Sequence, residues 1–84
     1  MREEQKTEEF TYEVIEHLAS VSDEDAKYEV QLNAISFKGK PPRLDIRRWR
    51  NGKMYKGISL SREEARRLAR ALEEAADRDD LPVE

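Results

Sequence analysis

The sequence predicts an α+β domain in which four antiparallel strands are followed by one C-terminal helix. Three observations carry this prediction. Short runs rich in β-branched and aromatic residues alternate apolar and polar positions between residues 10 and 60. The pair Asn51-Gly52 separates the last two runs and is the strongest short signal for a two-residue hairpin turn. After residue 60 the apolar residues recur at helical spacing.

The first expected strand covers residues 10–18. Its β-forming residues favour a strand, but a helix is the competing interpretation because three apolar residues also recur at i, i+4 and i+8. These residues are Phe10, Val14 and Leu18. An acidic loop over residues 20–25 separates this strand from the second, which is expected at residues 28–37.

The third and fourth strands are expected at residues 43–50 and 53–60, after a turn at residues 39–42. Because alternate side chains of a strand point to opposite faces, the third strand divides into two groups. The group expected to face the core is Leu44 and Ile46, and the group expected at the surface is Asp45, Arg47 and Trp49. We interpret Asp45 as a structural partner that orients Arg47 or another cation.

The helix is expected to run from Ser61 to about Asp77. Its first residues, Ser61 to Glu64, form a capping box, in which each of these two side chains bonds the other's backbone N–H. One helix cannot cover a four-stranded sheet, so its apolar stripe is expected to contact a second copy of the chain. The residues predicted at this dimer interface are Ala65, Leu68, Ala69 and Leu72.

Composition limits the protein to one small domain. Of its 84 residues, 37% are hydrophobic and 42% are charged, so the core is expected to be thin and a homo-oligomer to complete it. The expected domain is 10–78, with a disordered acidic tail at 1–9 and a frayed tail at 79–84. The absence of cysteine excludes disulfides and thiolate metal sites. No apolar run is long enough for a membrane span, and a cytoplasmic protein is expected, associated with the nucleoid if bacterial.

The net charge of −3 conceals a strong asymmetry. Residues 1–26 hold two cations and nine anions, whereas residues 27–56 hold nine cations and two anions. Within the basic part, residues 36–50 interleave cations with Phe37 and Trp49. Cations follow a phosphate backbone and flat aromatic rings stack on unpaired bases, so this pattern on a sheet predicts a single-stranded nucleic-acid binder.

Several motifs resemble, in order, the single-stranded-DNA-binding domain of the positive cofactor 4 family of transcriptional coactivators. They are Phe37-Lys38-Gly39-Lys40, Asp45-Ile46-Arg47 and Lys56-Gly57-Ile58-Ser59-Leu60. Leu32-Asn33, Pro41-Pro42 and Trp49 make the chain similar also to the small bacterial YdbC-like relatives. The resemblance implies a curved ββββα sheet, a symmetric homodimer with helices at its interface, and binding of single-stranded DNA with little sequence preference.

The resemblance carries the DNA-facing role to Phe37, Lys38, Lys40, Arg47 and Lys56, and to Lys53 through a hairpin that is shorter here. The chain has Trp49 followed by Arg50 where the coactivator has a tyrosine-tryptophan pair. Together with the charge pattern, this predicts the full nucleic-acid site as Phe37, Lys38, Lys40, Arg43, Arg47, Trp49, Arg50, Lys53 and Lys56.

Two other functions remain open at this point. The basic sheet could dock an acidic partner, such as a transcription or replication protein, or it could bind single-stranded RNA. The cellular process, transcription regulation or DNA replication and repair, is equally open. An enzyme is not expected, because no nucleophile–base pair, metal-ligand spacing or phosphate-cradling glycine loop is present, and no cofactor is expected either. His17, the one histidine, is interpreted as a surface strand residue.

Overall fold

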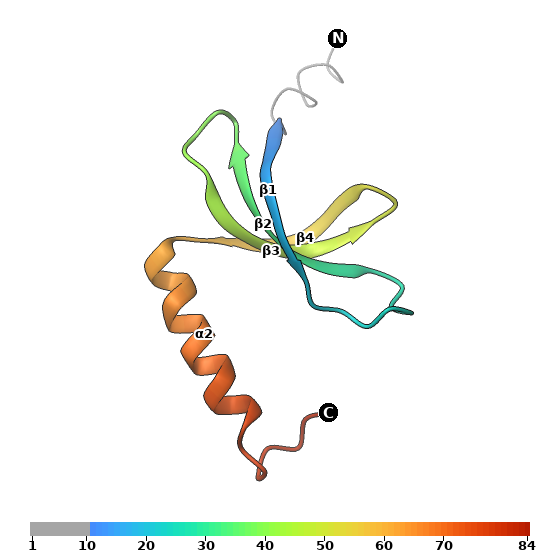
Figure 1. Ribbon diagram of the computed structural model, residues 1–84, viewed down its shortest axis with the longest axis vertical. Coiled ribbons are helices and arrows are strands. Elements are labelled where there is room, and N and C mark those ends of the chain that lie inside the picture. The colour runs from blue at the N-terminus through green and yellow to red at the C-terminus, as the bar shows by residue number, and fades with distance from the viewer. Residues whose placement is uncertain (1–10) are drawn as a thin grey trace.

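A computed structural model of the chain describes residues 11–84, and in this part four strands are followed by one helix (Figure 1). The elements are β1 (Tyr12–Ser20), β2 (Glu29–Phe37), β3 (Arg43–Arg50), β4 (Lys53–Leu60) and α2 (Arg62–Ala76). The strands form one antiparallel sheet in the order β1-β2-β3-β4. The α+β prediction is confirmed, as is the choice of strand over helix for the first segment. The predicted tail at residues 1–9 lies outside the described residues.

Two tight turns join the last three strands. Lys38 and Gly39 have φ values of 56° and 73°, and the Lys40 N–H donates to the Phe37 carbonyl at 3.0 Å. Asn51 and Gly52 repeat the pattern with φ values of 53° and 76°. Two successive positive φ values define the mirror-image turn whose twist matches that of the strands it joins. The Asn51-Gly52 prediction is therefore confirmed. The expected turn at residues 39–42 lies within the connection between β2 and β3, whose tight part begins one residue earlier, at Lys38.

Interruptions of the strand register bend the sheet. The pairing of β1 with β2 shifts between Val14 and Glu16 and again between His17 and Ala19, and that of β3 with β4 shifts between Arg47 and Trp49. Such bulges bend a strand and increase its twist. As a result, the ring of Tyr12 in β1 lies 6.3 Å from the ring of Trp49 in β3, although β2 separates the two strands.

The core lies on the concave face of this bent sheet. Ile35 and Asp45 are completely buried, and Asn33, which pairs with Asp45 across β2 and β3, is nearly so. By contrast, Leu44 and Ile46 on the opposite face remain half-buried. The expected assignment of core and surface faces on β3 was therefore wrong. The curvature of the sheet explains the difference, because a bent sheet closes over its own concave face without needing a second layer.

Helix α2 begins and ends where the sequence predicted. The Glu64 N–H donates to the Ser61 hydroxyl at 3.1 Å, and the Ser61 N–H donates to the Glu64 carboxylate at 2.8 Å. This second bond to a backbone N–H holds the pKa of Glu64 below its ordinary value. The helix ends at Ala76 with Asp77 as its C-cap, which confirms the expected end.

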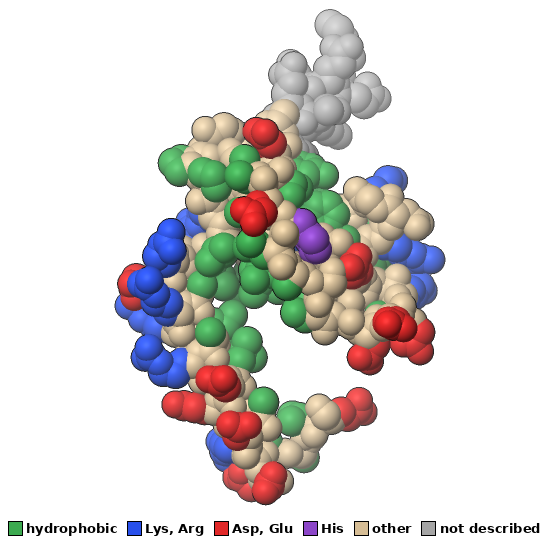
Figure 2. Space-filling view, in the orientation of Figure 1, with side chains coloured by type: hydrophobic (Ala, Val, Ile, Leu, Met, Phe, Trp, Pro, Cys, Tyr) green, Lys and Arg blue, Asp and Glu red, His purple; other side chains and the backbone are tan. Residues whose placement is uncertain are grey.

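Beyond its first turn, α2 projects away from the sheet (Figure 1). Hydrophobic side chains line the hollow between helix and sheet, while Lys and Arg side chains lie on the outer side of the helix (Figure 2). No residue of α2 is buried: Leu72 is 57% exposed, and Ile58 on β4 is 53% exposed. Of the helices in residues 11–84, none is long and apolar enough to cross a membrane.

Candidate nucleic-acid interface

The concave face is organised by an ion pair between Asp45 and Arg47. Arg47 donates to the two carboxylate oxygens of Asp45 through Nε at 2.6 Å and Nη2 at 2.7 Å, and the Ser59 hydroxyl donates to the same carboxylate at 2.9 Å. Asp45 is completely buried and the Arg47 side chain is only 15% exposed. The interpretation of Asp45 as the partner that orients Arg47 is confirmed. A bidentate pair of this kind fixes the guanidinium plane.

The orientation of Arg47 shapes an aromatic pocket of about 560 Å³, a volume in the range of small-ligand sites. The guanidinium carbon of Arg47 lies 5.4 Å from the centre of the Phe37 ring, and Nη1 of Arg47 donates to the Tyr55 carbonyl at 3.1 Å. We define the aromatic pocket by the residues that line it, which are Thr11, Tyr12, Phe37, Lys38, Arg47, Met54 and Tyr55. Three predicted site residues therefore come together: Phe37, Lys38 and Arg47.

Tyr12 is a site residue that the sequence reasoning missed. Its ring centre lies 6.4 Å from that of Phe37, because the first residue of β1 pairs with the last residue of β2. A signal was available in the sequence, since antiparallel pairing of neighbouring strands places the start of the first beside the end of the second. An aromatic residue at each of those two positions predicts an aromatic pair.

Trp49 does not offer the exposed stacking surface that was predicted. It is only 9% exposed, and the Tyr12 ring packs against it at 64°. The strand parity was right, because Trp49 shares a face with Asp45 and Arg47, but that face is the concave one. The indole N–H of Trp49 is buried without a hydrogen-bond partner among the described residues. Its position beside Tyr12 makes Trp49 a natural fluorescent reporter of the aromatic pocket.

Three predicted cations surround the turn between β2 and β3. Lys38 lines the aromatic pocket and Lys40 is exposed two residues later. Arg43, at the start of β3, instead pairs with Glu64 of α2 at 3.2 Å, with both side chains about half exposed. Exposed pairs of this kind contribute little stability, so Arg43 remains able to exchange partners. The turn thus presents Lys38 at the pocket and an exposed Lys40 two residues along the chain.

The remaining predicted cations lie on the β3–β4 hairpin. Arg50, Lys53 and Lys56 are all exposed, and Arg50 pairs with Lys53 across the two strands. Strand alternation places Arg48 on the side of Arg50, away from Arg47, as the sequence indicated. The nine predicted residues therefore fall into three groups. The concave face holds Phe37, Arg47 and Trp49, the β2–β3 turn and the start of β3 hold Lys38, Lys40 and Arg43, and the β3–β4 hairpin holds Arg50, Lys53 and Lys56.

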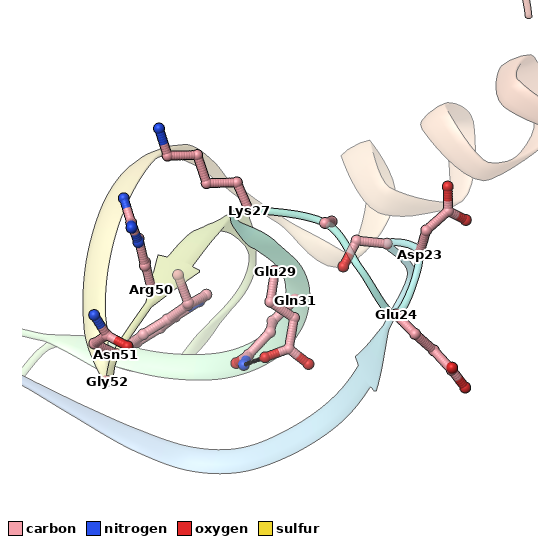
Figure 3. Close-up of a pocket in the computed structure, with 11 residues that line it drawn as sticks. Asp23, Glu24, Lys27, Glu29, Gln31, Arg50, Asn51 and Gly52 are labelled. Atoms are coloured by element: carbon pink, nitrogen blue, oxygen red, sulfur yellow. Dashed lines mark hydrogen bonds between the residues drawn. The ribbon is translucent and has the colours of Figure 1, made fainter.

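A second pocket, of about 330 Å³, lies between the acidic loop and the β3–β4 hairpin. Glu29 and Gln31 lie in its middle, with Asp23 and Glu24 on one side and Lys27 and Arg50 on the other (Figure 3). Hydrogen bonds from Ser20 and Gln31 hold the pKa of Glu29 below its ordinary value, so this carboxylate stays charged. The mixed charge makes this pocket a poorer place for a phosphate than the aromatic pocket.

His17 is exposed on β1, as expected, and its Nδ1 lies 2.7 Å from the side-chain oxygen of Asn33. This bond links the surface to the buried polar residues of the concave face. Within residues 11–84, no three His, Cys, Asp or Glu side chains are grouped in a way that could hold a metal ion.

The strand order, the single C-terminal helix and the two turns with successive positive φ values define a small ββββα protein with a basic, aromatic sheet. Comparison with known families gives a specific match. Residues 24–71 match the family model described as Transcriptional Coactivator p15 (PC4). This is more than half of the chain, and the chain belongs to that family, as its motifs had indicated. The match begins after β1, so Tyr12 lies outside it.

A relative in Treponema pallidum (strain Nichols), an uncharacterized protein, is 36% identical over 59 residues. The similarity covers 68% of this chain and 69% of the relative. This similarity supports the family assignment. Because the relative is uncharacterized, the similarity gives no information about activity.

Proposed function

We propose that the protein binds single-stranded DNA with little sequence preference, and that the aromatic pocket receives an unpaired base. The observation that carries this proposal is the convergence of Tyr12, Phe37 and Arg47 beside Lys38. Aromatic faces stack on any base, at about 1–3 kcal/mol per base, while the cations hold the phosphate backbone. Membership of the PC4 family supports the same function.

In this mechanism Arg47 acts mainly as a fixed wall of the pocket. Its charge is balanced by Asp45, and its guanidinium face stacks over Phe37. Lys38, which lines the pocket, and Lys40 in the same turn are both exposed and are the better phosphate contacts. A base in a duplex is already stacked and paired, so only an unpaired base enters the pocket without an unstacking cost.

The first test is a titration of the full chain with labelled oligo-dT of about 20 nucleotides, a matched duplex and oligo-U, followed by anisotropy and Trp49 fluorescence. We expect salt-sensitive binding to the single strand, with Trp49 emission changed because Tyr12 shifts as the base enters. Each neutralised phosphate should add about 0.7 to the slope of log K against log salt. Equal binding to single strand and duplex with unchanged Trp49 emission would refute the proposal and favour a protein-docking surface. Tighter binding to oligo-U would reassign the ligand to RNA.

A substitution at Lys38 tests whether its charge contributes to binding, without disturbing the fold. Lys38 adopts a positive φ of 56°, a conformation that Asn tolerates well, so Lys38→Asn removes the cation and keeps the turn. We expect this variant to keep the wild-type melting temperature or exceed it, and to bind oligo-dT with a salt slope smaller by about 0.7. Arg66→Gln, which removes a cation from the exposed Arg66–Glu63 pair on α2, is the matched control. If the slope of log K against log salt fell equally in both variants, binding would depend only on the total charge of the protein and not on the position of Lys38.

We propose further that two copies of the chain associate through α2 and the apolar face of the sheet. The proposed interface contains Ala65, Leu68, Ala69 and Leu72, which are half-buried or exposed in the single chain, and Figure 2 shows the apolar hollow beside them. An exposed apolar face of this extent is typical of an association surface.

Substitution of Leu72 tests the dimer. Because Leu72 is exposed in the single chain, Leu72→Glu leaves the fold of one copy intact and places a charge in the proposed interface. We expect the dimer dissociation constant, measured by sedimentation equilibrium, to rise at least about tenfold. Arg70→Glu, on the opposite side of the helix, should leave it nearly unchanged. A wild-type chain that sediments as a monomer at all concentrations would contradict the proposal.

We infer a binding protein rather than an enzyme, acting on the single strands that transcription, replication or repair expose in the cytoplasm or nucleoid. The aromatic pocket supports this inference, because its lining provides stacking surfaces and cations but no nucleophile beside a base.

A further inference from the structure

An apolar pocket of about 430 Å³ lies where α2 leaves the sheet, on the face opposite the concave site (Figure 1). Residues of three neighbouring strands line it: Ala34 of β2 pairs with Leu44 of β3, and Leu44 pairs with Leu60 of β4. All three are only half-buried in the single chain. We call this site the apolar pocket, and the single chain leaves its apolar surface uncovered.

Two cations also line the apolar pocket. They are Arg43 and Arg62, and both are exposed. Arg43 pairs with Glu64 at 3.2 Å, but a pair with both side chains about half exposed contributes little stability and can exchange its partner. A segment that fills the apolar pocket should therefore combine apolar side chains with carboxylates.

The C-terminal tail, residues 79–84, has this composition. It reads Asp-Asp-Leu-Pro-Val-Glu. Leu81 is half-buried and Val83 is 70% exposed. Pro82 fixes its own φ and favours an extended residue before it, which lowers the entropy lost when the tail is ordered. Asp80 accepts hydrogen bonds from Arg78, which hold its pKa below the ordinary value, so this carboxylate stays charged.

The length of α2 separates the tail from the apolar pocket of its own chain. The helix has 15 residues and is about 22 Å long, and the pocket lies at its first residue, Arg62. The five residues from Asp77 to Leu81 extend at most about 18 Å, so Leu81 falls short of that pocket. In an antiparallel pair of helices, however, the end of one α2 lies beside the start of the other. The apolar pocket of the second copy is then within reach.

The charges at the two ends of α2 favour this antiparallel arrangement. The last turn of the helix contains no basic residue, and residues 77–84 hold four anions and one cation. A parallel pair would bring two acidic ends and two negative ends of the helix dipole together. An antiparallel pair instead places each acidic end beside Arg43 and Arg62 of the other copy.

We propose that the C-terminal tail of each copy fills the apolar pocket of the other copy in the dimer. Leu81 and Val83 cover the apolar wall, and Asp79 and Asp80 lie beside Arg43 and Arg62. This inference rests on the association of two copies given under the proposed function. Because each copy both donates and receives a tail, the interface obeys two-fold symmetry.

Cross-linking tests which pocket the tail occupies. The chain contains no cysteine, so single cysteines can be introduced without competing thiols. Pro42 lines the apolar pocket and is exposed, so Pro42→Cys reports on the pocket and Val83→Cys reports on the tail. The two variants are mixed and oxidised with copper phenanthroline, and the mixed disulfide is measured by mass spectrometry. Val21→Cys replaces Val83→Cys in the control, because Val21 is 69% exposed and lies in the loop after β1.

We expect at least about tenfold more mixed disulfide with Val83→Cys than with Val21→Cys, because docking holds the two thiols at a high effective concentration. Equal yields would overturn the docking of the tail. The combined variant Pro42→Cys with Val83→Cys should form links between copies. A disulfide closed within one chain would also overturn the inference, because the tail would then occupy its own pocket.

A measurement without cysteines tests the same contact. We expect Leu81→Ser to raise the dimer dissociation constant, measured by sedimentation equilibrium, at least about tenfold, and Val21→Ser to leave it nearly unchanged. An unchanged dissociation constant for Leu81→Ser would overturn the docking of the tail while leaving the dimer intact. A wild-type chain that is always a monomer would instead overturn the proposed dimer itself. The oligo-dT titration tests the nucleic-acid function separately from both.

Discussion

Replacing Asp45 with alanine is expected to lower the free energy of unfolding by about 3–5 kcal/mol, the usual cost of removing one partner from a buried ion pair. Asp45 is completely buried and accepts hydrogen bonds from Arg47 and Ser59. Without it, Arg47 keeps a charge that is largely shielded from water and has no compensating carboxylate. The expected result follows from that uncompensated charge.

The measurement is urea unfolding at fixed protein concentration, followed by the emission of Trp49, which is buried in the folded chain and becomes exposed on unfolding. Asp45→Asn is the graded control, because its amide oxygen still accepts one hydrogen bond from Arg47. We expect it to cost less than Asp45→Ala. A loss below about 1 kcal/mol for Asp45→Ala would show that the pair is not part of the core.

The same substitution should also affect the ligand site. Arg47 forms a wall of the aromatic pocket and is held there by Asp45. Once released, it turns toward solvent and no longer lies over Phe37. Under conditions where Asp45→Ala remains folded, we expect this variant to bind oligo-dT more weakly than the wild type, because a stacking surface that moves must be ordered again on binding.

Gly57→Ala is expected to destabilise the protein by about 3 kcal/mol or more, since over-packed sites cost up to that amount where the structure can relax. A Cβ atom built on Gly57 would lie 1.9 Å from the Arg47 Cβ and 2.3 Å from the Ile46 carbonyl oxygen. Both neighbours belong to β3, which pairs with β4 at this position. The strands would have to separate beside the bulge that bends the hairpin.

Gly52→Ala provides the control for the conformational effect of the same substitution. Gly52 has a φ of 76° and nothing within 4 Å of a built Cβ, so alanine there costs only backbone strain, about 1–2 kcal/mol. We expect Gly57→Ala to have the lower melting temperature of the two. The reverse order would show that β3 and β4 do not approach as closely as described.

Local sequence predicted the elements well because their causes are local. The Asn51-Gly52 turn follows from two residues that accept positive φ, and the start of α2 follows from reciprocal bonds within the four residues Ser61 to Glu64. The contact of Asp45 with Arg47 was also within reach, because residues two apart in a strand share a face.

The candidate site was predicted only in part. Phe37, Lys38 and Arg47 do meet at one pocket, but Trp49 is buried beside them and Tyr12 joins them from β1. Alternation along a strand shows which side chains lie on the same face. It does not show whether that face is covered.

The sequence by itself determined the strands, the tight turn at Asn51-Gly52, the helix with its cap, and the basic and aromatic character of the middle of the chain. Only the tertiary structure decided which face of the sheet is closed. Bulges in β1 and between β3 and β4 bend the sheet, so that Tyr12 reaches Trp49 across β2. The contact between Tyr12 and Trp49 depends on the combined curvature of three strands, so no single segment of the sequence predicts it.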